Sequence, residues 1–357
     1  MKILCFHPAL APYRIDFFNL LCASVELKIL FLQTNLFSQK FDQAALRAQL
    51  KCPYGELTRG FDIKGRCIRF GARKAIVEEN PDVVLAYEAS PVTLLLILYK
   101  KLLFRRLKIW TFMDDSPSQV RSRRGLRKFV RDWVIRNVNK VIVPSGQAAA
   151  AYPSAFPSSR FAPVPIIHDE NAIRENADAV YSMATAWRKE HISNGWTKVL
   201  LFVGRLAKVK NLDWLIAALP VMKKSIGLVL VGNGEEEETL KAQVATLGLR
   251  DRVIFAGRKE GDELYSMMAM ADALVLCSHS EPFGAVVAEA LQWGTPCVVS
   301  ENCGAAMLIE DGVNGCVFPY SDIQAFVRIV MNLPFRADYS LLNVSLADSV
   351  VRLTRGI

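Results

Sequence analysis

The segment from residue 273 to residue 300 constrains the fold most. Residues 273–277 and 296–300 are short apolar runs of the kind that fills buried parallel strands. Between them, residues 285–293 are rich in helix-forming residues, and Gly294 is suited to the left-handed end of a helix. The segment therefore predicts a strand, a loop, a helix and a second strand.

Similar apolar and helical patterns alternate along the rest of the chain. In the first half we expect strands at residues 2–6, 27–31, 83–87, 108–112 and 141–144, and helices at 14–22, 72–79, 93–104 and 126–137. In the second half we expect further strands at 199–203, 228–231, 253–255 and 315–318, and helices at 212–219, 235–247, 263–270, from 322 onward and at 342–353. Residues 35–71 are polar and less periodic, which predicts irregular or edge structure. The alternation predicts an α/β protein with two doubly wound, Rossmann-like domains.

A domain boundary is expected where the composition changes. Residues 152–168 contain four prolines, and a second alternating series follows them. A chain of 357 residues is also long enough for two or three domains. We therefore predict a first domain at residues 1–167 and a second at 168–336.

Positive charge is concentrated in the first half. Residues 1–168 contain 26 Lys and Arg against 12 Asp and Glu, a net charge of +14, whereas the remaining residues contain 18 against 23, a net charge of −5. This asymmetry predicts an anionic surface or partner for one domain, and nucleic acid and membranes are the usual candidates. Few aromatic residues lie within the basic cluster and no nucleic-acid motif is recognised, so we expect no nucleic-acid partner.

The remaining composition favours a cytoplasmic protein. The first eight residues contain an apolar core too short for a signal peptide, and no apolar run reaches the roughly 18 residues that span a bilayer. The eight cysteines include no C-x-x-C pair, which favours reduced core thiols over disulfides or a zinc site. We expect no metal and no other required cofactor.

Two glutamates and a glycine follow the strand expected at 273–277. Ligands gather at the carboxyl ends of parallel strands, where helix amino ends offer unpaired N–H groups. Glu281 in the loop and Glu289 in the helix can face one crevice there, and Gly284 allows a ligand to approach the backbone. The arrangement suits a polyhydroxylated, phosphorylated ligand, although two solvated glutamates are the alternative.

Two cations follow the strand expected at 199–203. Gly204 permits a tight turn, and Arg205 and Lys210 are spaced so that both can reach the same crevice. Fixed cations would stabilise a departing diphosphate without a catalytic metal. The alternative is a solvated helix start, because Lys208 lies nearby.

Five blocks of sequence, in order, carry a family resemblance. They are Phe202-Val203-Gly204-Arg205-Leu206 with Lys210, Val231-Gly232-Asn233-Gly234, Val253-Ile254-Phe255-Ala256-Gly257, Glu281-Pro282-Phe283-Gly284 with Glu289, and Asp311-Gly312-Val313-Asn314-Gly315. Together they resemble family 4 of the retaining, sugar-nucleotide-dependent glycosyltransferases, which have the GT-B fold. The resemblance covers roughly residues 199–320 and is weaker before them.

The resemblance implies a GT-B architecture, in which two Rossmann-like domains face a cleft. The first domain would bind the acceptor and the second a UDP- or GDP-sugar, while residues 337–357 would form a helix that crosses back to the first domain. The implied reaction is retaining transfer of a sugar to a hydroxyl of a saccharide or lipid-linked saccharide. Bacterial surface polysaccharide, capsule or lipopolysaccharide synthesis is the expected setting.

Residue roles also follow from the resemblance. Arg205 and Lys210, after Gly204, would bind the donor diphosphate. Glu289 would hold the ribose hydroxyls and Glu281 would face the transferred sugar. The backbone of Phe283, Gly284, Ala285 and Val286 would contact the sugar and phosphate, and Gly257 and Arg258 would frame the base. Gly232 and Gly234 are expected to serve the strand-to-helix turn.

The first domain departs from the family pattern. Met113 stands where the family usually has a histidine that helps to position the donor sugar, which leaves Asp114 or Asp115 as the polar replacement. The family's Gly-rich first loop is also missing. In its place, Tyr13 and Arg14 are expected either to shape an acceptor pocket or to form a structural turn.

Two further functions and one location remain open at this point. A nucleotide-sugar epimerase shares the fold, and a basic nucleic-acid-binding protein is a weaker alternative. Residues 101–140 carry 12 basic against three acidic side chains and follow the apolar residues 92–99, which favours peripheral binding to the anionic inner face of the cytoplasmic membrane. The alternative is a buried crossover helix beside a solvated basic face.

Overall fold

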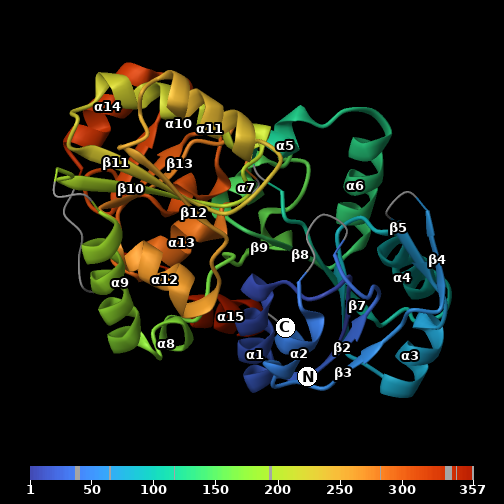
Figure 1. The fold of residues 1–357 in the computed structure, drawn as a ribbon. Coiled ribbons are helices and arrows are strands. Elements are labelled where there is room, and N and C mark those ends of the chain that lie inside the picture. The colour runs from blue at the N-terminus through green and yellow to red at the C-terminus, as the bar shows by residue number, and fades with distance from the viewer. Residues whose placement is uncertain are drawn as a thin grey trace. The chain divides into compact units, whose positions relative to one another are not determined.

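The computed structural model describes residues 1–36, 41–63, 66–115, 117–192, 195–281, 283–333, 340–342 and 344–355. It forms two compact units (Figure 1). The first unit comprises Met1–Asp169 and Leu346–Ile357, and the second comprises Glu170–Ser345.

A seven-stranded parallel sheet forms the centre of the first unit, in the order β3-β2-β1-β6-β7-β8-β9. Its strands are β1 (Lys2–His7), β2 (Glu26–Phe31), β3 (Tyr54–Glu56), β6 (Val83–Tyr87), β7 (Lys108–Phe112), β8 (Lys140–Val143) and β9 (Phe161–Pro163). The strand order reverses between β1 and β6, and such a switch point is where ligands bind in doubly wound folds.

Helices cover both faces of this sheet because the strands are apolar on both sides. Leu4 and Phe6 of β1 belong to one core, with the buried side chains of α3 (Ala72–Glu79), α4 (Pro91–Leu102) and α6 (Gly125–Asn137). Two other helices of this unit, α1 (Ile15–Ser24) and α15 (Leu346–Arg355), contact each other. Lys140 Nζ donates to the Leu353 carbonyl oxygen over 3.1 Å, which ties the chain's last helix to β8.

The segment predicted to be irregular contains short elements. They are α2 (Gln43–Ala48), the edge strand β3, and an antiparallel hairpin of β4 (Gly60–Ile63) and β5 (Arg66–Arg69). The remaining elements of the unit are η1 (Pro12–Arg14), α5 (Pro117–Ser122), α7 (Gly146–Ala151) and η2 (Ser158–Arg160).

The second unit contains a six-stranded parallel sheet in the order β12-β11-β10-β13-β14-β15. Its strands are β10 (Lys198–Val203), β11 (Ile226–Val231), β12 (Val253–Gly257), β13 (Ala273–Leu276), β14 (Cys297–Ser300) and β15 (Gly315–Phe318). The helical segments are α8 (Glu170–Ile173), α9 (Ala177–His191), η3 (Lys208–Lys210), α10 (Leu212–Ala218), η4 (Leu219–Val221), α11 (Glu237–Thr246), α12 (Gly261–Met270), α13 (Ala285–Gln292), η5 (Gly304–Leu308) and α14 (Ile323–Met331). Here the order reverses between β10 and β13.

Both doubly wound sheets confirm the fold predicted from the sequence. The strands predicted at 83–87, 108–112 and 315–318 have the predicted bounds. Helix α9 was not predicted, because residues 177–191 are polar overall and follow the expected domain boundary. The helix packs against α12, and its Val180 and Ala184 are buried. The eight cysteines are all free, and six of them are buried.

Candidate functional site

The switch point of the second unit brings Lys210 and Glu281 together. Lys210 ends η3, after β10, and Glu281 follows β13, the neighbouring strand. Their side chains form an ion pair, and they are only 19% and 15% exposed. Partial burial strengthens such a pair, because less water screens it.

Backbone and thiol contacts hold the two loops together. The His279 N–H donates to the Val209 carbonyl oxygen over 2.9 Å. The Cys277 thiol, whose pKa is raised by burial, donates to the Lys210 carbonyl oxygen at 3.2 Å. These contacts join the loops that carry Lys210 and Glu281, at the edge of the sheet where β10 and β13 end.

Three glycines shape the loop that carries the cations. Gly204, which follows β10, has a φ of +149°, and a Cβ on Gly232 would lie 1.9 Å from the Gly204 carbonyl oxygen. A Cβ on Gly234 would lie 2.3 Å from the Leu206 carbonyl oxygen. The Leu206 N–H donates to the Asn233 carbonyl oxygen over 2.9 Å. Gly232 and Gly234 thus allow the loops that follow β11 and β10 to pack together.

Helix α13 begins beside this pair. Its N-cap, Gly284, has a φ of +91°, and a Cβ there would lie 2.7 Å from Leu276 Cδ2. Phe283 is buried, whereas Ala285, Val286 and Glu289 are partly exposed. The first amides of a helix lack partners within the helix, so this end can accept an anion.

The other predicted donor residues lie on the same edge of the sheet. Arg205 follows β10 and is exposed. Gly257 ends β12 with a φ of +67°, and its carbonyl oxygen accepts from the Gly232 N–H at 2.8 Å. Arg258, which follows it, is exposed and pairs with Glu260. Pro282 lies outside the described residues.

In the first unit, the switch point contains a buried polar cluster. Arg14, only 3% exposed, donates to Asp114 Oδ1 at 2.5 Å, and the Tyr87 hydroxyl donates to Asp114 Oδ2 at 3.2 Å. Burial raises the pKa of Tyr87, and Asp114 adds to the effect. Asp114 follows β7 and Tyr87 ends β6, so the cluster forms where these strands end.

His7 at the end of β1 completes this cluster. Its ring lies among Phe18, Tyr87 and Phe112, with centroids 5.1 to 6.2 Å away. Burial, and after it the Arg14 cation, lowers its pKa to about 3, which keeps the imidazole neutral. Tyr13 is partly buried, and its ring centroid lies 5.9 Å from the Arg14 guanidinium carbon.

Asp115 belongs to a separate ion-pair network. Arg123 and Arg131 both donate to its carboxylate, the latter at 2.6 Å, and the Tyr152 hydroxyl donates at 2.7 Å. Burial opposes ionisation of Asp115, but the hydrogen bonds from the two guanidinium groups outweigh it and lower the pKa. Arg131 also pairs with Glu88. Asp115 is only 3% exposed, which makes Asp114 the more accessible aspartate.

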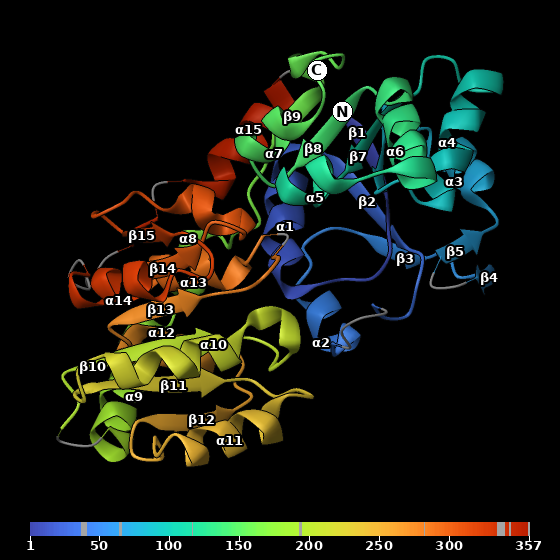
Figure 2. The ribbon, with the colours of Figure 1, turned by 90° about the horizontal axis from the view of Figure 1, so that it is seen from above.

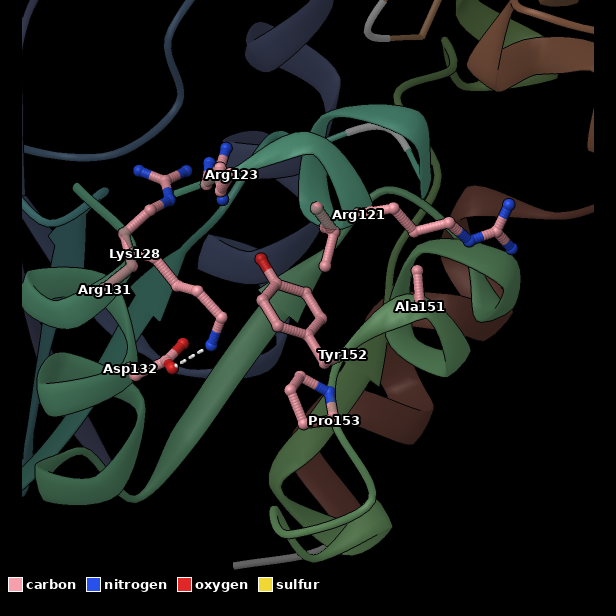
Figure 3. Close-up of a pocket in the computed structure, with 9 residues that line it drawn as sticks. Arg121, Arg123, Lys128, Arg131, Asp132, Ala151, Tyr152 and Pro153 are labelled. Carbon is pink, nitrogen blue, oxygen red and sulfur yellow. Dashed lines mark hydrogen bonds and ion pairs between the residues drawn. The ribbon is translucent and has the colours of Figure 1, made fainter. Parts of the chain in front are cut away.

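A pocket of about 160 Å³ lies against this network (Figure 3). Its lining includes Arg121, Arg123, Lys128, Arg131, Asp132 and Tyr152. Lys128 Nζ donates to Asp132 at 2.6 Å, and Figure 3 shows the Arg121 guanidinium turned away from Tyr152. Three of the four cations are therefore already paired with carboxylates. Within the part of the chain that the structure describes, no group of three His, Cys, Asp or Glu side chains could hold a metal ion.

Sequence reasoning missed the partners of the first-unit residues. Tyr87 is predicted only as the end of a strand, Glu88 is not singled out by any motif, and Arg131 is counted in the basic cluster. The sequence did contain a signal for this clustering, because Tyr87 and Glu88 lie at the end of one predicted strand and Asp114 lies just after the next. The network partners could not be paired without knowing where α6 lies.

A family comparison identifies the second unit. Residues 183–333 match the family model described as glycosyl transferases group 1. These residues belong to the glycosyl transferases group 1 family. The matched residues include both Lys210 and Glu281, so the family resemblance predicted from the sequence is confirmed for this domain.

Curated relatives match this domain over part of their length. An uncharacterized glycosyltransferase of Methanocaldococcus jannaschii, MJ1607, is 40% identical over 125 residues, which cover 34% of this chain and 32% of the relative. A lipopolysaccharide core biosynthesis glycosyltransferase of Rhizobium meliloti, LpsE, is 33% identical over 143 residues, which cover 40% of this chain and 41% of the relative. The chain therefore spans less than half the length of these relatives.

A solved structure matches the whole fold. The Anabaena protein Alr3699/HepE, in a crystal structure with UDP, superposes with a TM-score of 0.74 at 20% identity. The match covers 99% of this chain and 94% of that one. With the two doubly wound sheets, this likeness confirms the GT-B type of fold outside the glycosyltransferase domain as well as within it. No helix described here is long and apolar enough to span a bilayer.

Proposed function

We propose that this chain transfers a sugar from a nucleotide-sugar donor to a hydroxyl acceptor, with retention of the anomeric configuration. The observation that carries the proposal is the ion pair of Lys210 and Glu281 at the switch point of the glycosyltransferase domain. A cation for a diphosphate and a carboxylate for sugar hydroxyls lie together there, where doubly wound folds bind nucleotides.

The pair suggests how the donor would be bound. Lys210 would exchange the carboxylate of Glu281 for the diphosphate, and Arg205, which is exposed, would add a second cation. Glu281 would then accept hydrogen bonds from hydroxyls of the transferred sugar. Glu289 would hold the ribose, the α13 amino end would contact phosphate and sugar, and Gly257 with Arg258 would frame the base.

The proposed reaction needs no base from the protein. The acceptor hydroxyl attacks the anomeric carbon from the face that the nucleotide leaves, forming the new C–O bond as the bond to phosphate breaks. The electron pair of that bond goes to the phosphate oxygen, which also receives the acceptor proton. Arg205 and Lys210 stabilise the negative charge that develops on the diphosphate, as fixed cations do in phosphoryl and glycosyl chemistry.

The first unit would supply the acceptor side. Asp114 is the more accessible of the two predicted aspartates, and Tyr13 and Arg14 are its neighbours. A saccharide or lipid-linked saccharide of surface polysaccharide synthesis is the proposed acceptor class, because the Rhizobium relative is a lipopolysaccharide core biosynthesis glycosyltransferase. UDP is the first nucleotide to test, because the Anabaena structure contains it.

Thermal unfolding with nucleotides tests the donor site. UDP, GDP and their sugar conjugates are added to the wild type, to Lys210→Ala and to Lys208→Ala, which removes an exposed lysine of the same turn. A ligand at one hundred times its Kd stabilises the native state by about 2.7 kcal/mol. We expect one nucleotide to raise the melting temperature of the wild type and Lys208→Ala, with a much smaller rise for Lys210→Ala.

Turnover tests the reaction itself. Release of nucleoside diphosphate should require an added acceptor, and the new linkage should keep the donor's anomeric configuration. Conversion of the donor sugar without an acceptor would instead identify an epimerase. If no nucleotide stabilises the wild type, the donor-site assignment fails.

A further inference from the structure

Large apolar side chains lie exposed along one face of α6. Leu126 and Phe129 are 77% and 66% exposed, and Trp133, one turn further along the same face, is partly buried. The opposite face is buried through Val134 and Ile135. Residues three or four apart share one face of a helix, so Leu126, Phe129 and Trp133 form a continuous stripe.

The end of α4 extends this stripe. Leu98 is 48% exposed and Leu102, one turn later, is 66% exposed, followed by Leu103 at 51%. Helices α4 and α6 pack against each other, and Figures 1 and 2 both show them side by side. Lys101 Nζ lies 5.3 Å from the centroid of the Trp133 ring, which links the two rows. We call Leu98, Leu102, Leu103, Leu126 and Phe129 the α4–α6 apolar surface.

Basic side chains accompany this surface along the chain. These side chains lie close in the sequence to the apolar residues of the surface, and all of them are exposed: Lys101, Arg105, Arg106, Arg121, Arg124 and Arg127. Not every cation of the basic cluster expected from the sequence is available to a partner. Arg123 pairs with Asp115, and Arg131 pairs with both Asp115 and Glu88. The six cations named above are exposed and can contact a partner.

We propose that the α4–α6 apolar surface docks on an anionic lipid bilayer. Exposed leucine and phenylalanine side chains enter the boundary between headgroups and acyl chains, and flanking cations attract acidic headgroups. A single anionic surface satisfies both sets of side chains. The proposal goes beyond glycosyl transfer and stands without it.

Charge argues against a second copy of the chain as the occupant. A two-fold dimer places the same patch of both subunits face to face. The basic side chains would then lie opposite each other and repel, whereas acidic lipid neutralises them. Nucleic acid would match the charge but would leave the leucines exposed to water or to phosphate.

Vesicle co-sedimentation of the full chain tests the proposal. The wild type should bind vesicles of phosphatidylcholine mixed with phosphatidylglycerol, should not bind phosphatidylcholine alone, and should be released as salt is raised. Arg124→Ser with Arg127→Ser should lower the partition coefficient about 30-fold, equivalent to about 1 kcal/mol for each arginine. Leu126→Ser with Phe129→Ser should lower it at least tenfold, roughly, because apolar area no longer enters the bilayer.

The control changes exposed residues elsewhere in the same unit. Arg73→Ser with Val77→Ser alters one cation and one apolar side chain on α3, both exposed, and should leave binding unchanged. Equal binding to neutral vesicles, no binding to either kind, or an equal loss in the control variant would overturn the proposal. A dimer that Leu126→Ser with Phe129→Ser dissociates would assign the surface to a second copy instead.

Discussion

Arg14 and Asp114 form an ion pair of 2.5 Å at the switch point of the first unit, although 100 residues separate them in the sequence. The guanidinium is buried and also lies 4.4 Å from the centroid of the Phe112 ring. Burial opposes its charge, but Asp114 outweighs burial and raises the pKa of Arg14. A permanently charged, buried side chain therefore depends on one carboxylate.

Removing that carboxylate should destabilise the protein. Asp114→Ala leaves the buried Arg14 charge without its partner, so the free energy of unfolding in urea should fall by about 3 kcal/mol. Replacing both residues with apolar ones, as in Arg14→Met with Asp114→Leu, should recover much of this loss. Glu26→Ala, which removes a 70% exposed partner of Lys2, is the control and should have little effect. Equal stability of Asp114→Ala and Glu26→Ala would contradict the prediction.

His7 should make stability depend on pH. Its pKa is about 3 in the folded protein, through burial and then Arg14, against about 6.5 in an unfolded chain. Between these two pH values only the unfolded chain binds a proton on His7. The contribution of the neutral His7 to stability is therefore complete above pH 6.5, and the free energy of unfolding falls by about 1.4 kcal/mol per pH unit below pH 6.5. In His7→Asn, with Arg14, Asp114 and Tyr87 unchanged, urea unfolding from pH 7 to 4 should show a shallower dependence. An unchanged slope would refute this assignment.

Asp115 and Asp132 each pair with cations that line the pocket. Asp115→Ala removes the shared partner of Arg123 and Arg131, which are largely buried, and should cost about 3 kcal/mol of unfolding free energy. Asp132→Ala breaks a helical pair with the half-exposed Lys128 and should cost about 0.5 kcal/mol or less. Similar losses in the two variants would show that the Asp115 network is not essential to stability.

Gly232 should matter for the donor site through packing. A Cβ there would meet the Gly204 carbonyl oxygen at 1.9 Å, so Gly232→Ala must displace the loop that carries Arg205 and Lys210. We expect at least about tenfold weaker binding of the stabilising nucleotide, because displaced cations no longer converge on the diphosphate. Gly146→Ala, where a Cβ meets nothing within 4 Å, is the matched control for calorimetric titration. Unchanged affinity in Gly232→Ala would show that the loop does not contribute to nucleotide binding.

Glu289 should bind the ribose through its charge. Glu289→Gln keeps the size of the side chain but loses one charged acceptor, so affinity for the nucleoside diphosphate should fall about tenfold or more. Glu190→Gln on α9, at an exposed glutamate of the same unit, should bind as the wild type does. If titration finds equal affinity in both variants, Glu289 has no part in the donor site.

Local sequence was sufficient for most elements of the fold. Apolar strands such as Val83–Tyr87 and Lys108–Phe112 fill parallel sheets, and their patterns differ from those of the helices between them. The order of glycines, cations and glutamates after β10 and β13 also predicted which side chains share one edge. Lys210 and Glu281 are 71 residues apart, yet the alternation alone places both after strands, at the same edge.

Only the tertiary structure decided which charges are internal. In the sequence, Arg121, Arg123, Arg124, Arg127 and Arg131 form one basic run. Helix α6 and the turn before it direct Arg123 and Arg131 to Asp115 and Glu88, and leave the others exposed beside Leu126 and Phe129. Secondary structure depends on neighbours along the chain, whereas a charge becomes buried only when distant segments pack around it and replace its water.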